Sequence, residues 1–170
     1  YTYSVIIENP NSDYEVTLPR YKVEAFDENN KSITHYEQLL PYMGPNDRIA
    51  FSSAVITKDT KAAKIEFTII NDPIEYVKST SFNNKDSFTF ENTNETKDQN
   101  STVIVGDVIS NLPNDQDQIA ITVLLRKDGK IIHGHTSFIH GVRSGEATPF
   151  EAKTYSDIDY DTYELSAMIW

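Results

Sequence analysis

Apolar and polar residues alternate with a period of two in several parts of this chain. The alternation is clear from Tyr21 to Ala25 and again from Ile119 to Leu125. A period of two is typical of a strand that turns one face toward a core. We therefore expect the side chains at 21, 23 and 25, and those at 119, 121, 123 and 125, to point inward. No segment has a convincing helical period, so the pattern predicts an all-β chain.

Further strands are expected wherever apolar runs lie between turns rich in Gly, Pro, Asn and Asp. In one of them Ile65, Phe67 and Ile69 should point inward. In another, Pro19 should mark an edge position or a bulge. Short strands separated by such turns are typical of an antiparallel sandwich. Together, the expected strands cover residues 3–8, 16–26, 33–36, 49–56, 64–70, 102–110, 119–126, 131–139, 147–155 and 162–170.

A matched window suggests that the sandwich occurs twice. Lys31 to Phe51 spans 20 residues, and so does Lys130 to Phe150. The turns also correspond, with Asn30 opposite Gly129 and Pro45–Asp47 opposite Ser144–Glu146. In the strands that precede the two windows, the inward residues of the two copies are separated by one residue less than the windows are. This difference predicts hairpin turns that differ in length by a residue or contain a bulge.

The sequence thus predicts two tandem immunoglobulin-like antiparallel β-sandwich domains, at residues 1–80 and 81–170, with a polar linker near 78–90. We expect only a small interface between them, which would permit relative movement. Two unrelated sandwiches that share turn chemistry are the alternative.

Short motifs in both halves resemble the FxLYD domain. Val23–Asp27 followed by Asn30–Lys31 is similar to the signature of that family, and Val123–Lys130 keeps the turn without the aromatic residue and the first Asp. Ser144–Glu146 and Phe150 are similar to the family's Pro-Gly-Glu and Phe. The resemblance implies an immunoglobulin-like fold and a location in lipoproteins or secreted proteins of Gram-positive bacteria. It carries no catalytic residues.

Composition excludes several classes of partner. The net charge is −11 and the pI about 4.7, which disfavours nucleic acid and anionic membrane surfaces. Cys is absent, so no disulfide can form, and no apolar run approaches the roughly 20 residues of a membrane-spanning helix. The chain starts at Tyr1, which predicts a processed chain or a piece of a longer one.

Three histidines are candidate metal ligands. His133 and His135 should share one face of a strand, and His140 follows five residues later. Histidines at alternate positions can bind zinc or copper when a third ligand is present. The spacing alone is a weak signal, and a structural role on the strand surface is favoured.

An acidic loop near the C-terminus is a candidate calcium site. Asp157, Asp159 and Asp161, with Glu164, resemble half of a calcium-binding loop. The Gly and the closing Glu of an EF-hand are absent, so a solvated acidic loop is favoured. We expect neither a bound metal nor a cofactor.

No pattern in the sequence indicates catalysis. There is no Cys, no Gly-x-Ser-x-Gly elbow and no Gly-rich phosphate loop. The expected function is therefore a non-enzymatic extracellular structural or interaction module of a bacterial cell-envelope or secreted protein, lipid-anchored or released. Its partner would be another cell-surface protein or a glycan. The alternative is a carbohydrate- or peptide-binding module that uses an edge strand or exposed tyrosines, among them Tyr36, Tyr42, Tyr155, Tyr160 and Tyr163.

Overall fold

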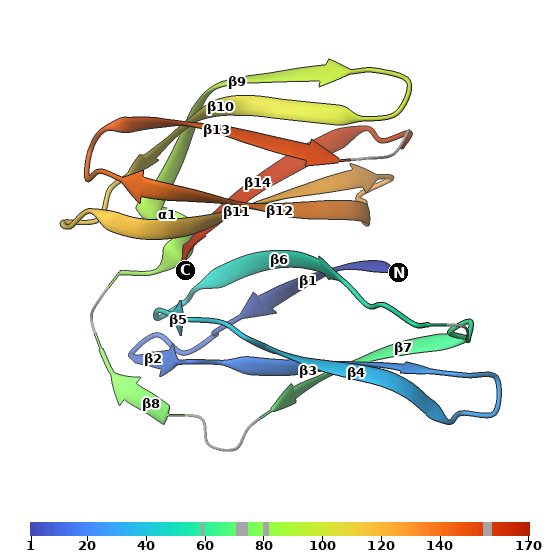
Figure 1. The fold of residues 1–170 in the computed structure, drawn as a ribbon. Coiled ribbons are helices and arrows are strands. Elements are labelled where there is room, and N and C mark those ends of the chain that lie inside the picture. The colour runs from blue at the N-terminus through green and yellow to red at the C-terminus, as the bar shows by residue number, and fades with distance from the viewer. Residues whose placement is uncertain (59, 71–74, 80–81, 155–157) are drawn as a thin grey trace.

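The structure is a computed structural model that describes residues 1–58, 60–70, 75–79, 82–154 and 158–170. Its described part is built of β-strands with one single-turn helix (Figure 1), which confirms the all-β prediction. The strands of the first half are β1 (Thr2–Glu8), β2 (Tyr14–Thr17), β3 (Arg20–Phe26), β4 (Ser32–Leu39), β5 (Tyr42–Met43), β6 (Arg48–Ala54), β7 (Lys64–Ile70) and β8 (Glu75–Lys78). The second half contains α1 (Asn84–Ser87), β9 (Phe88–Lys97), β10 (Thr102–Ser110), β11 (Gln116–Lys127), β12 (Lys130–Val142), β13 (Ala147–Thr154) and β14 (Thr162–Ile169).

Each half forms an antiparallel sandwich. In the second half a β13-β10-β9 sheet faces a β12-β11-β14 sheet, an order typical of immunoglobulin-like folds. In the first half a β4-β3-β7 sheet faces the two-stranded β1-β6 ribbon, and a small β5-β2-β8 sheet lies at one end. Among the described residues every ladder joins strands of the same half. The chain passes from the first sandwich to the second between Lys78 and Asn84.

The two sandwiches share their connectivity, as the matched window predicts. β3 pairs with β4 and β7 as β11 pairs with β12 and β14, and β1 pairs with β6 as β10 pairs with β13. Corresponding turn residues also have the same left-handed backbone, with φ of 59° at Asn30 and 74° at Gly129, and 53° at Asn46 and 72° at Gly145. Asn and Gly are the residues that adopt this conformation most readily.

The hairpins explain the one-residue offset. Both have a register shift just before the turn, after Ala25 in β3 and after Leu125 in β11. When the two register shifts are aligned, Ala25 of the first copy corresponds to Leu125 of the second. The alternation in the sequence instead matched Ala25 with Val123. The first turn is then one residue longer than the second, so the expected difference is present, together with a bulge in each copy.

Two local expectations were wrong. Residues 16–26 do not form one strand. Leu18, just before Pro19, has a φ of 51°, so β2 ends at Thr17 and β3 begins at Arg20. The sequence predicts a loop-like stretch after residue 78 except for a strand at Phe88 and Phe90, but the stretch also contains α1, and the strand β9 extends over ten residues. β9 pairs with β10 over most of its length, so backbone hydrogen bonds stabilise a sequence with few apolar residues.

The central strand of the second half is buried on both faces. Ile119, Ile121, Val123 and Leu125 point into the sandwich core, as expected, and all are 0% exposed. Ala120 and Met168 instead join a cluster with Ile49 and Phe51 of the first half. In Figure 1 the β1-β6 ribbon accordingly lies between the β4-β3-β7 and β12-β11-β14 sheets. The two sandwiches thus share a hydrophobic cluster, where the sequence predicts only a small interface.

Candidate functional site

Threonine hydroxyls from the second half cap the free edge of β6. The Oγ1 of Thr122, which is 1% exposed, donates to the carbonyl of Ala50 at 2.9 Å. The Oγ1 of Thr136 accepts from the N–H of Ser52 at 2.9 Å and lies 2.8 Å from that of Thr122. A hydroxyl has one proton, so Thr136 must donate to Thr122. This chain of hydrogen bonds satisfies two backbone groups that β1 cannot reach.

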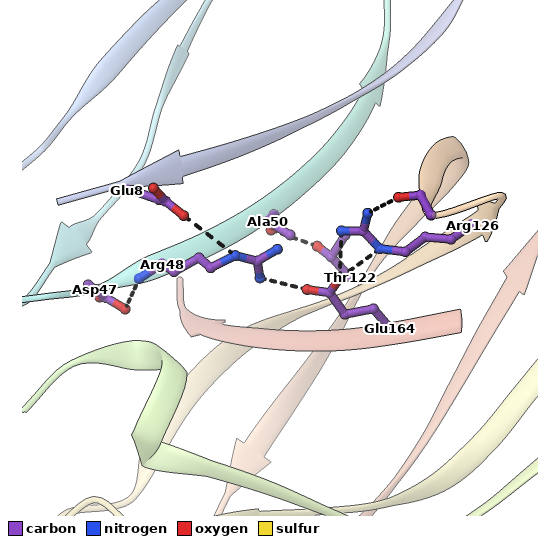
Figure 2. Close-up of polar contacts among 8 residues, drawn as sticks. Glu8, Asp47, Arg48, Ala50, Thr122, Arg126 and Glu164 are labelled. Carbon is purple, nitrogen blue, oxygen red and sulfur yellow. Dashed lines mark hydrogen bonds and ion pairs between the residues drawn. The ribbon is translucent and has the colours of Figure 1, made fainter. Parts of the chain in front are cut away.

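A carboxylate between two guanidinium groups lies near Thr122 (Figure 2). The Nη1 of Arg48 lies 2.6 Å from Glu164 Oε1, and Arg126 donates to Glu164 Oε2 from Nε at 3.0 Å and from Nη2 at 2.7 Å. Arg48 also lies 3.8 Å from Glu8. Burial of Glu164 alone would raise its pKa, but the hydrogen bonds from the two arginines outweigh this effect and lower the pKa below its usual range.

We expect Glu164→Gln to destabilise the chain by about 1–2 kcal/mol near neutral pH, because both arginines lose a partly buried partner. The folded pKa is depressed, so the stabilisation is complete above the unfolded value of about 4.3 and is lost as the pH falls through the lower folded pKa. The difference in urea stability between wild type and variant should therefore be constant from about pH 6 to pH 8 and shrink below about pH 4.3.

Glu146→Gln is the matched control, because its pair with Arg143 is exposed at both partners. We expect it to change stability by less than about 0.5 kcal/mol at any of these pH values. Equal effects of the two substitutions would contradict a stabilising role for Glu164 at the junction.

A buried aspartate joins the first sandwich to the linker. Asp47 is 1% exposed and accepts hydrogen bonds from Gly44, Arg48, Asn84 and Lys85. The side chain of Asn84 supplies the shortest of them, at 2.7 Å, and its Oδ1 accepts from the N–H of Ile169 at 3.0 Å. The turn before β6, the helix α1 and the last strand are therefore connected through two side chains.

Close packing completes the junction. A Cβ added to Gly134 would lie 2.3 Å from the hydroxyl oxygens of both Ser4 and Ser52, so a larger residue there must displace these groups. Nearby, the ring of Trp170 stacks on Phe51 with centroids 5.2 Å apart and meets Phe138 edge-on at 4.9 Å. We call this whole contact, centred on β6, β11 and β14, the junction.

The three histidines do not converge. His133 and His135 lie on the same face of β12, and burial lowers the pKa of both. His140 lies on the opposite face, about 17 Å along the strand from His135, with its ring 3.5 Å from the amide of Gln118. The structure thus brings together only two of the three candidate ligands.

The acidic loop is bound to the neighbouring hairpin. Asp159 forms an ion pair with Lys127, which lowers the pKa of the aspartate, and Asp161 accepts from the N–H of Asp128 at 2.8 Å. Asp157 lies outside the described residues. Within the described part of the chain, no group of three or more His, Cys, Asp or Glu side chains is placed to hold a metal ion.

The candidate tyrosines lie in separate places. Tyr36 is 44% exposed on β4, whereas Tyr160 is buried beneath the Lys97 ammonium, 3.7 Å from the ring centroid. The ring of Tyr42 packs on Phe82 with centroids 5.0 Å apart. Tyr163 is partly buried against the second core, and Tyr155 lies outside the described residues.

The sequence interpretation missed the junction residues. Glu164 entered only as a calcium candidate, and Asp47, Arg48 and Thr122 were assigned no role. One signal was present: from Ile119 to Leu125 both alternating sets lack charge, and a strand buried on both faces has that composition.

Comparison with known proteins finds similarity only among solved structures. No family model matches it, and no curated protein does. Among solved structures, Bacteroides uniformis beta-glucuronidase 2, covalently bound to cyclophellitol-6-carboxylate aziridine, matches at 10% identity and a TM-score of 0.33, over 98% of this chain and 24% of that one. A calcium-binding mutant of the same enzyme matches at 12% identity and a TM-score of 0.29, over 92% of this chain and 22% of that one. This chain thus spans about a quarter of the length of these enzymes, and likenesses this distant carry no functional argument.

The part of the chain that the structure describes contains no candidate membrane-spanning helix.

Proposed function

We propose that this chain is a non-enzymatic structural module of a bacterial cell-envelope or secreted protein, in which two sandwiches act as one rigid spacer. The junction supports this proposal. Its charged and polar side chains, including Asp47 and Glu164, bond to other groups of the protein, which suits a role in holding the halves together. The resemblance to FxLYD domains supports the envelope location.

Exposure on intact cells tests the location. Protease added to whole bacteria that carry the native protein should cleave it, or an antibody should label it, without lysis. Detection only after the cells are broken would contradict an extracellular module. The rigidity of the spacer is a separate property and requires a distance measurement on the purified chain.

A glycan-binding surface is the competing proposal, and one hollow favours it. Tyr36 and Ile56, which are 44% and 70% exposed, line a depression of about 580 Å³ together with Asp27, Thr34 and Lys58. An exposed ring among polar groups suits stacking on a sugar. Saturable binding on a glycan array that Tyr36→Ala abolishes would favour this function over a spacer without ligands.

A further inference from the structure

One long edge strand lacks the residues that usually prevent a strand edge from pairing with another chain. β12 lies at the end of the β12-β11-β14 sheet and pairs only with β11 among the described residues. The twelve residues from Ile131 to Val142 include no Asp, Glu, Lys, Arg or Pro. Natural proteins place such charges and prolines on edge strands because unpaired backbone groups otherwise bind a further strand. This part of β12 is therefore an unprotected edge.

The other edge strands of similar length carry that protection. Charged residues or proline occur within each of them: Glu37 in β4, Glu91, Glu95 and Lys97 in β9, Pro149, Glu151 and Lys153 in β13, and Glu164 in β14. β4, which corresponds to β12 in the first half, also pairs on one side only among the described residues. The open edge thus belongs to both copies of the sandwich, but only the copy in the second half leaves it uncharged.

The hydrogen-bond pattern shows which backbone groups of β12 face the open side. The N–H of Trp170 donates to the carbonyl of Gln118 at 3.1 Å, so Gln118 and every second residue after it bond to β14. The alternate residues of β11, from Ile119 to Leu125, bond to the odd-numbered residues of β12 from His133 to Ile139. The N–H and C=O groups that point away from β11 therefore belong to Gly134, Thr136, Phe138 and His140.

Apolar side chains and free space lie beside this edge. Ile132 and Phe138 are 43% and 41% exposed. A hollow of about 400 Å³ lies between β12 and residues Ser52–Ala54 of β6, and it is lined by Gly134, Thr136 and Phe138. The first sandwich therefore does not fill the space next to the edge, and side chains of an added strand can lie there.

We propose that this chain forms a two-fold symmetric dimer, in which β12 pairs antiparallel with β12 of a second copy. The register centred on Ser137 places Thr136 opposite Phe138 of the second copy, and Gly134 opposite His140. All four outward residues are then paired. Phe138 lies diagonally across from Gly134 of the second copy, within reach of an aromatic ring, and glycine leaves room for that ring.

A second copy matches this edge by symmetry. Two chains with a net charge of −11 repel each other, but here they meet where both strands are uncharged. The outward set is symmetric about Ser137, so the same residues supply donors and acceptors on both sides, as in an isologous contact. A single strand pair buries little surface, so we expect a Kd of about 10–100 µM. The dimer goes beyond the proposed spacer function and does not depend on it.

Sedimentation equilibrium between about 10 µM and 1 mM tests the association. The mass should rise from the 19.3 kDa of one chain toward twice that value. Over the same range, hydrogen exchange at the amide protons of Phe138 and His140 should slow by about threefold or more. The amide proton of Ile139 bonds to β11 and should be protected at every concentration.

A cysteine on the two-fold axis tests the register. The chain has no cysteine of its own, and residues opposite each other in a pair without hydrogen bonds are close enough to form a disulfide. Mild oxidation should therefore convert Ser137→Cys into a covalent dimer at least about tenfold faster than Gln38→Cys. Gln38 is the matched control, because it occupies the corresponding position of β4.

Two further variants should break the dimer. Ser137→Lys places two like charges opposite each other, and His140→Pro removes an N–H that faces the second copy. Each should weaken association by about tenfold or more, and two variants allow for one that fails to fold. Gln38→Lys on β4 should associate as the wild type does. Ser137→Lys also gives a monomer in which distances within one chain can be measured.

A single species of 19.3 kDa at about 1 mM would overturn the proposal. So would association that Ser137→Lys and His140→Pro leave unchanged, or cross-linking of Gln38→Cys as fast as that of Ser137→Cys. The dimer does not require the rigid junction. Glu164→Gln should therefore associate normally, and failure of one proposal leaves the other standing.

Discussion

Asp47→Ala is expected to lower the free energy of unfolding by about 3–5 kcal/mol, because several buried N–H groups lose their acceptor at once. The carboxylate accepts from backbone donors of Gly44, Asn84 and Lys85 as well as from the Asn84 amide. Alanine leaves the donors of Gly44 and Asn84 buried and unpaired. Since Asn84 also bonds to Ile169, the loss should extend to the last strand. Urea unfolding followed by tryptophan fluorescence measures it, because Trp170 lies at the junction.

Asp27→Ala is the matched control. Asp27 is also an aspartate in a turn of the first sandwich, and it accepts from the N–H groups of Asn29 and Lys31, but those bonds are exposed. Water can replace them, so we expect a cost of about 1 kcal/mol or less. If Asp47→Ala cost no more than Asp27→Ala, the buried hydrogen bonds would not hold the linker to the two sandwiches.

Gly134→Ala is expected to destabilise the chain by about 1–3 kcal/mol, because the new methyl group overpacks the junction. Its Cβ would lie 2.3 Å from the hydroxyl oxygens of Ser4 and Ser52, which are themselves hydrogen-bonded at 2.8 Å. Either both hydroxyls rotate and lose that bond, or β12 separates from the β1-β6 ribbon. Thermal or urea unfolding measures the cost.

Removal of the two hydroxyls should rescue this variant. In the Ser4→Ala, Ser52→Ala background, Gly134→Ala should cost less than half of its effect in wild type, since the two nearest atoms are absent. Gly129→Ala is the control for backbone strain alone. It has a φ of 74° and no neighbour within 4 Å, and should cost about 1 kcal/mol without any rescue. An equal cost of Gly134→Ala in both backgrounds would contradict close packing at this point.

Local patterns predicted the elements because they depend on neighbouring residues. The left-handed positions at Asn30 and Gly129 follow from turn chemistry, and the inward set from Ile119 to Leu125 follows from a period of two. Strand β10 has the predicted bounds of 102–110. The period of β7 likewise gave the direction of Phe67, whose ring lies 5.3 Å from that of Tyr3. A period does not tell how far a face is covered, and Phe67 is 44% exposed.

The junction could not be predicted in the same way, because its contacts join distant parts of the chain. Arg48 and Glu164 are 116 residues apart, and Asp47 and the Asn84 amide are 37 apart. No spacing rule connects such pairs, and in the sequence each residue resembles an ordinary polar residue of a protein surface. Only the uncharged second face of β11 indicated that another layer packs there.

The central claim is that the two sandwiches form one rigid unit, and a distance distribution across the junction tests it most directly. The chain has no cysteine, so spin labels at His35→Cys and Glu151→Cys, two exposed positions on β4 and β13, attach without background. Pulsed electron paramagnetic resonance should give one narrow distance peak in the wild type, and a broader one when Asp47→Ala is added. A broad or multiple distribution in the wild type would contradict the rigid junction.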